Sequence, residues 1–248
     1  RMKIKEHVTP DKRFTGAEPP KPKVELVNQT RGGHQTRGGS WLDLMLESDD
    51  QALRRITDQS MVVESMIPAQ SYGYFFGQSG HKKSFVVLDI CHAVATGRPW
   101  LGYDGHVDFT TPEPGLVVYV AAEGSNGLRV RKRAIEQASG IEAPDLRILP
   151  AAPLMDESDQ AQALAKALRQ LEIRKGEQVR MVVLDTLSQT AAGDQNNASE
   201  MARFIAGCKE VQDHGAAVVV VHHSGLADAE RLRGSPNLKA AGDVEFWV

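Results

Sequence analysis

Residues 71–97 have the sequence SYGYFFGQSGHKKSFVVLDICHAVATG. The aromatic residues 72–76 favour a β-strand, and the apolar residues between 85 and 95 recur with the spacing of a helix. Between them lies GQSGHKKS, residues 77–84. The pattern G-x-x-x-x-G-K-S/T between a strand and a helix binds phosphate, because backbone N–H groups surround the anion while the Lys and the hydroxyl reach the phosphates and Mg²⁺. The stretch predicts such a P-loop; the alternative is a Gly-rich turn before an ordinary helix.

The octet departs from the pattern at one position. Gly77, Lys83 and Ser84 fit it, whereas Lys82 stands where the second Gly is expected and Gly80 lies two positions earlier. Because Gly at that position lets backbone amides approach a phosphate, Lys82 leaves the geometry of the loop open. The predicted nucleotide-binding residues are Gly77, Gln78, Ser79, Gly80, His81, Lys82, Lys83, Ser84 and Phe85.

Composition limits the class of protein. The chain has 248 residues, of which 41% are hydrophobic and 25% charged, which suits one large α/β domain with an appendage or two smaller domains. Its formal net charge of -3 predicts no global attraction to nucleic acid, so such a site would have to be local. Neither Cys91 nor Cys208 has metal-ligand spacing, which favours a reducing, cytoplasmic compartment. No apolar run is long enough for a membrane span or export signal, and no membrane contact is expected.

The rest of the chain predicts an alternation of strands and helices. Residues 1–40 are poor in large apolar side chains and are predicted to be a linker or arm, while 41–248 form the folded domain, which we expect to be cut from a longer chain. Two short helices are expected within 41–56 and an extended piece at 62–68. Buried strands are predicted at 116–122, 146–149, 179–184 and 216–221, and helices at 128–138, 160–173 and 200–212, the last preceded by a polar loop at 188–199. The alternation predicts a mainly parallel sheet with helices on both faces.

Polar residues follow the predicted strands, at the edge where ligands bind in open α/β sheets. Asp185, after a hydrophobic strand, is predicted to hold Mg²⁺ together with Ser84. Glu123 is the predicted general base that activates water, with Glu113 or Asp194 as substitutes if Glu123 proves dispensable. Either acid alone could instead be a helix cap or a solvated turn.

Two adjacent histidines, His222 and His223, follow the last predicted strand. His222 is the first choice to hydrogen-bond the γ-phosphate, partly charged near neutral pH, and His223 the second. The alternative is that the pair is a plain surface turn.

Five segments in order resemble the RecA-type ATPases of plasmid RepA-like hexameric helicases and of the ATPase modules that phages attach to primases. The segments are GQSGHKKSF with ATGRPWLG, GLVVYVAAEGSNGLRVR, VVLDTLSQTAAGDQNNASEM, VVVVHHSG and RLRGSPNLKAAGD, within residues 60–248. The resemblance implies a RecA-like core, ATP with Mg²⁺, and a homo-oligomeric ring, expected to be a hexamer, through which single-stranded DNA passes. It also implies that Lys83 and Ser84 hold phosphate and metal, Glu123 activates water, Asp185 is the Walker B acid and His222 the sensor.

The arginine that a neighbouring subunit supplies in that family has no counterpart in GDVEFWV, so Arg231 and Arg233 are the nearest substitutes. Nucleic acid is expected at the loops 188–199 and 224–235. The basic run 129–133 is predicted to be a solvated helix face or a subunit contact rather than a DNA groove. Two functions remain open: an ATP-driven motor in DNA replication, or a nucleotide-binding assembly or regulatory subunit with little turnover.

Overall fold

The structure is a computed structural model, and it describes residues 60–101, 109–122, 124–225 and 232–248. The predicted arm at 1–40 and the two short helices within 41–56 lie outside the described residues. The strands are β1 (Met61–Val63), β2 (Ile67–Pro68), β3 (Tyr72–Gly77), β4 (Leu116–Ala121), β5 (Leu146–Leu149), β6 (Val179–Asp185), β7 (Ala217–His223) and β8 (Val244–Trp247). The helices are α2 (Lys83–Thr96), α3 (Ser125–Ser139), α4 (Ser158–Lys175), α5 (Leu187–Thr190), α6 (Ala198–Gln212) and α7 (Pro236–Ala241).

A six-stranded sheet with the order β5-β4-β6-β7-β3-β8 organises the described chain, and every pair of neighbouring strands in it is parallel. The strands β3, β4, β6 and β7 are buried almost throughout, which explains why their sequences are continuous apolar runs rather than alternating ones. Strand β7 lies between β3 and β6. The loop that follows β3 and the acid that ends β6 are therefore one strand apart.

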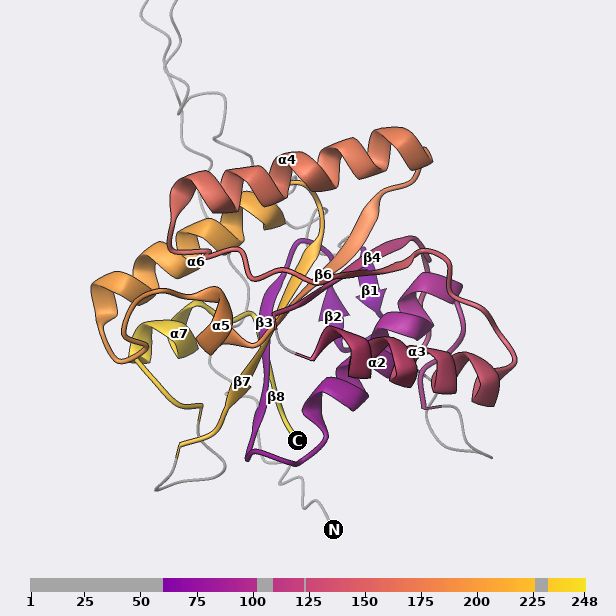
Figure 1. The fold of residues 1–248 in the computed structure, drawn as a ribbon, viewed down its shortest axis with the longest axis horizontal. Coiled ribbons are helices and arrows are strands. Elements are labelled where there is room, and N and C mark those ends of the chain that lie inside the picture. The colour runs from indigo at the N-terminus through magenta and orange to yellow at the C-terminus, as the bar shows by residue number, and fades with distance from the viewer. Residues whose placement is uncertain (1–59, 102–108, 123, 226–231) are drawn as a thin grey trace, which may run out of the picture. The chain divides into compact units, whose positions relative to one another are not determined.

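Two hydrophobic cores lie on the opposite faces of this sheet. Side chains of α4, α6 and α7 pack on one face, against residues such as Val118, Leu184 and Val220. Helices α2 and α3 and the β1–β2 hairpin cover the other face, against Tyr119, Val183 and Val219. In Figure 1, α4 and α6 lie on one side of the strands and α2 and α3 on the other. The predicted α/β architecture with helices on both faces is confirmed.

The predicted strands and helices of the sheet and its covering layers agree with the structure except near their ends. Helices α3 and α4 are longer than predicted, and α2 ends before Gly97, whose φ of 73° suits a glycine. Helix α6 begins at Ala198 because the Asn197 side chain accepts hydrogen bonds from the N–H groups of Ser199 and Glu200.

Three predictions need correction. The polar loop predicted at 188–199 contains most of the short helix α5 (Leu187–Thr190), because Thr190 closes a turn on the carbonyl of Thr186. The extended piece at 62–68 is the two-stranded hairpin of β1 and β2. The two histidines are the last residues of β7 rather than a turn after it, since Phe76 and Gly77 of β3 pair with them. None of the described helices is long and apolar enough to cross a membrane.

Candidate nucleotide-binding site

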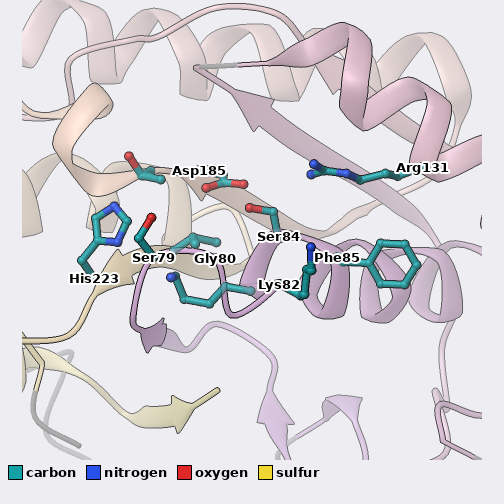
Figure 2. Close-up of a pocket in the computed structure, with 11 residues that line it drawn as sticks. Ser79, Gly80, Lys82, Ser84, Phe85, Arg131, Asp185 and His223 are labelled. Atoms are coloured by element: carbon teal, nitrogen blue, oxygen red, sulfur yellow. The ribbon is translucent and has the colours of Figure 1, made fainter. Parts of the chain in front are cut away.

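A cavity of about 650 Å³ opens at the carboxyl ends of β3, β6 and β7. Figure 2 shows its lining, in which the loop after β3 faces the end of β6. The lining residues are Ser79, Gly80, Lys82, Lys83, Ser84, Phe85, Arg131, Asp185, Thr186, Val221 and His223. The structure therefore brings together the predicted P-loop, the predicted Walker B acid and one of the two histidines.

The loop between β3 and α2 has the backbone of an anion site despite its unusual sequence. Gly80 has a φ of 86°, and Lys82, with φ 64° and ψ 19°, adopts the left-handed conformation that glycine favours. Within the described chain, no acceptor is bonded to the N–H groups of Gly80, Lys82, Lys83 or Ser84. Unpaired N–H groups at a helix N-terminus bind anions such as phosphate. Lys82 thus takes the place of the expected glycine without changing the backbone conformation that the position requires.

Gly77 is required for a reason that the motif does not reveal. A Cβ atom at this position would lie 2.1 Å from the carbonyl oxygen of Val248, because the segment after β8 runs directly beside the start of the loop. The Val248 N–H donates to the carbonyl of Phe76 at 2.9 Å. Gly77 therefore allows the close approach of a neighbouring backbone, whatever else it does for phosphate.

Backbone carbonyl groups of the loop hold the Lys83 side chain in place. Its side-chain Nζ donates to the carbonyls of Gly77 at 3.0 Å and Gln78 at 2.8 Å, and the residue is only 6% exposed. Burial lowers the pKa of this ammonium, and the nearby Asp185 carboxylate opposes that shift. Since an ammonium has three donors, two bonds to the loop leave one N–H for a phosphate oxygen.

Ser84 and Asp185 offer oxygen atoms on the same cavity, and a buried tyrosine bonds the acid. The hydroxyl of Tyr119 donates to Asp185 Oδ2 at 2.6 Å. A hydroxyl and a carboxylate are ligands that suit Mg²⁺, which usually completes its shell with phosphate and water. No group of three or more His, Cys, Asp or Glu side chains arranged for a metal occurs among the described residues. The donors present fit a metal shared with a nucleotide rather than an all-protein metal cage.

The two histidines differ from the prediction. His222, the first choice as phosphate sensor, is 0% exposed, does not line the cavity, and its Nε2 bonds the carbonyl of Arg233 at 2.9 Å. Burial lowers the pKa of His222 to about 4, so the ring is neutral at pH 7 rather than partly charged. His223, the second choice, lines the cavity. Alternation along β7 explains the difference, because adjacent residues of a strand point to opposite faces.

The structure describes arginines from two segments considered in the sequence analysis. Arg131 is exposed on α3, as predicted for the basic run, and it also lines the cavity. Figure 2 shows its guanidinium pointing towards Ser84 and Asp185. Arg233 is exposed and lines a second cavity, of about 490 Å³, with Gln78, Ser79 and His223 of the same chain. Arg231 lies outside the described residues.

Of the three carboxylates proposed as general base, the structure describes two, Glu113 and Asp194. Glu123 lies outside the described residues, although the N–H of the preceding Ala122 donates to the backbone carbonyl of Asp185 at 3.0 Å. Glu113 forms an ion pair of 2.8 Å with Arg180, the second residue of β6, and so lies at the amino ends of the strands. Glu113 is therefore excluded as a substitute base. Asp194 is exposed in the segment before α6 and does not line the cavity.

Tyr119 and Thr186 are site residues that the sequence reasoning missed. Tyr119 is a polar-tipped side chain in an otherwise apolar strand, and this pattern could have singled it out. Thr186 follows Asp185 directly, and the peptide bond between them is cis.

The family comparison agrees with this geometry. The family model described as "AAA domain" matches residues 41–229, which is more than half of the chain. The chain therefore belongs to the AAA domain family. Fold, site and family together define it as a P-loop ATPase, a class that binds nucleotide, typically with Mg²⁺. A comparison with curated proteins gives no match.

Proposed function

We propose that this chain is an ATP-driven nucleic-acid motor of the RepA-like helicase kind, acting in DNA replication of the phage or plasmid type. The observation that carries the proposal is the convergence of Lys83, Ser84, Asp185 and His223 on one cavity at the carboxyl ends of three adjacent strands. A site that only bound an anion would not need an acid facing the phosphate loop. Hydrolysis does, because Asp185 and Ser84 would hold the Mg²⁺ that, with Lys83, neutralises charge on several phosphoryl oxygens at once.

Each group then has a distinct task in converting ATP and water to ADP and phosphate. Lys83 and the free N–H groups of the loop would bind the β- and γ-phosphates, and Ser84 and Asp185 would hold Mg²⁺, which would neutralise phosphate charge. Arg131 reaches the same cavity from its own chain and can stabilise charge on the γ-phosphoryl oxygens. Glu123, placed by sequence after β4, would accept the proton of the attacking water.

The proposal includes a ring of subunits that encloses single-stranded DNA. The loops after β6 and β7 begin at the residues that face the cavity, so they are suited to report the state of the nucleotide to a bound strand. Arg233 is exposed on the second of these loops. An arginine in this segment would act on a neighbour's nucleotide, in addition to Arg131 within the chain.

ATP hydrolysis by the full-length protein, measured with and without single-stranded DNA over a hundredfold dilution, tests the proposal. We expect DNA to stimulate hydrolysis, specific activity to rise with protein concentration, and Lys83→Ala to reduce both ATP binding and turnover to background. Lys166→Ala is the matched control, since Lys166 is exposed on α4 and does not line the cavity. If the protein binds ATP but does not hydrolyse it at any protein concentration, with or without DNA, the motor is refuted and the assembly or regulatory subunit is favoured. Unchanged ATP affinity in Lys83→Ala would refute the nucleotide site itself.

A further inference from the structure

Tyr119 is the one phenol among the described residues that is bonded to a side chain of the nucleotide cavity. It lies in β4, on the far side of β6 from the phosphate loop. In the register of the two strands, Tyr119 pairs with Val183 and Ala121 with Asp185. Tyr119 and Asp185 are therefore diagonal neighbours on the same face of the sheet, a separation that an aromatic side chain can span.

The surroundings of Tyr119 leave its hydroxyl little freedom. The residue is 0% exposed, and its ring packs in the core between the sheet and helix α2. The hydroxyl donates to Asp185 Oδ2 at 2.6 Å, which is the short distance of a charge-assisted bond. Burial and the neighbouring carboxylate raise the pKa of the phenol well above its usual value.

The bond to Tyr119 involves only one of the two carboxylate oxygens of Asp185. Asp185 Oδ2 is occupied by the tyrosine, while no described residue is bonded to Oδ1. The carboxylate is thus fixed in rotation, with one oxygen available towards the cavity.

We infer that Tyr119 is a positioning residue that holds Asp185 in place for Mg²⁺ before the nucleotide and its metal arrive. This inference rests on the proposed function, because it concerns the metal of that same site. Partners that orient metal ligands contribute to metal affinity without touching the metal, and their loss typically costs about 10- to 100-fold. The simpler alternative is that Asp185 only satisfies a buried hydroxyl, in which case removal of the hydroxyl affects folding stability and not the metal.

Binding of a fluorescent ATP analogue to Tyr119→Phe, in EDTA and in Mg²⁺, separates these alternatives. In EDTA, we expect the variant to bind the analogue with an affinity within about twofold of the parent's. The concentration of Mn²⁺ that half-saturates the nucleotide-bound protein, measured by electron paramagnetic resonance, should rise by about 10- to 100-fold. Tyr74→Phe is the matched control, because Tyr74 is also fully buried and its hydroxyl donates to Tyr72 at 2.6 Å, away from the cavity. This control is expected to change neither quantity.

A double variant that combines Tyr119→Phe with Asp185→Asn provides a second test. It compares the effect of Tyr119→Phe in two backgrounds, so it does not rely on the folding stability of a single variant. If Tyr119 acts through Asp185, Tyr119→Phe has no further effect on Mn²⁺ affinity once Asp185 is changed. Parental metal dependence in Tyr119→Phe, additive effects in the double variant, or equal losses with and without metal would each overturn the inference while leaving the proposed function intact. A parent protein that binds no nucleotide would overturn both.

Discussion

Replacing Lys82 tests whether a lysine occupies a backbone position built for glycine. Its φ of 64° and ψ of 19° are left-handed values, which cost a residue with a Cβ about 1–2 kcal/mol relative to the right-handed helix. Glycine avoids that cost, but its unfolded chain is more flexible, and this lowers the unfolding free energy by about 0.5–1 kcal/mol relative to alanine. The net gain expected for Lys82→Gly over Lys82→Ala is therefore about 0.5–1 kcal/mol of unfolding free energy.

Comparing Gly with Ala at this position removes the other consequences of losing lysine. Both variants lack the ammonium, which is exposed at the cavity and close to the start of α2, where a positive charge is unfavourable. We expect both to bind ATP with the same affinity, weaker than the parent by about fivefold or less, as for an exposed ion pair. The stability difference between them then reports the backbone alone.

Equilibrium unfolding in urea, with the slope of the transition held common, measures this difference. Gln70→Gly and Gln70→Ala are the control pair, because Gln70 is exposed, has a φ of 54° and lies outside the cavity. This pair should show a similar stability gap and no change in ATP affinity. Equal stabilities for Lys82→Gly and Lys82→Ala would refute the left-handed conformation and, with it, the explanation of how this loop works without its second glycine.

Three further predictions concern charge. Arg131→Ala should lower the turnover of ATP by at least about tenfold. Arg129→Ala is the control, because Arg129 lies on the same helix but outside the cavity, and it should leave turnover unchanged. Equal effects of the two substitutions would favour the interpretation of the basic run as a subunit contact. Glu123→Gln should retain ATP binding and lose hydrolysis, since an amide cannot accept the proton, and parental turnover would place the base elsewhere. Titration of His222 should lower the unfolding free energy by about 3 kcal/mol as pH drops from about 6.5 to about 4, because His222 has a pKa near 4 in the folded chain and an ordinary pKa in the unfolded chain, which therefore binds the extra proton. Urea titrations of the parent and of His222→Gln at several pH values measure this loss. The same pH dependence in both proteins would contradict the prediction.

The order of elements was predictable because buried parallel strands have continuous apolar sequences. LVVYVA and VRMVVLD are two examples, and the acid at the end of the second fell at the ligand-binding edge as expected. The short helix α5 was not predictable from its polar sequence, LSQT, because its stability comes from Leu187 and Thr190 being buried against the sheet.

The part of the site that could not be predicted depends on which way side chains point. Sequence placed both histidines at the end of a strand, but the choice between His222 and His223 follows from the phase of β7, which the register with β3 fixes. Arg131 is exposed on α3 as predicted, but its place in the lining of the cavity depends on how α3 packs on the sheet and could not be predicted from the sequence. The contact between Tyr119 and Asp185 could not be predicted, because it depends on the pairing of β4 with β6.

The position of β3 in the sheet has a consequence for how the domain is made. Tyr72 pairs with Val218 on one side, and Gly73 pairs with Val244 on the other, so both neighbours of this strand are encoded far downstream. On a ribosome that adds about 5–20 residues per second, the aromatic run of β3 leaves the exit tunnel many seconds before either partner exists. The nucleotide cavity is incomplete during this interval, because Val221 and His223 of its lining have not yet been synthesised. The phosphate loop is thus among the first described parts of the domain to be translated, but the strand that carries it gains both its neighbours only when β7 and β8 emerge.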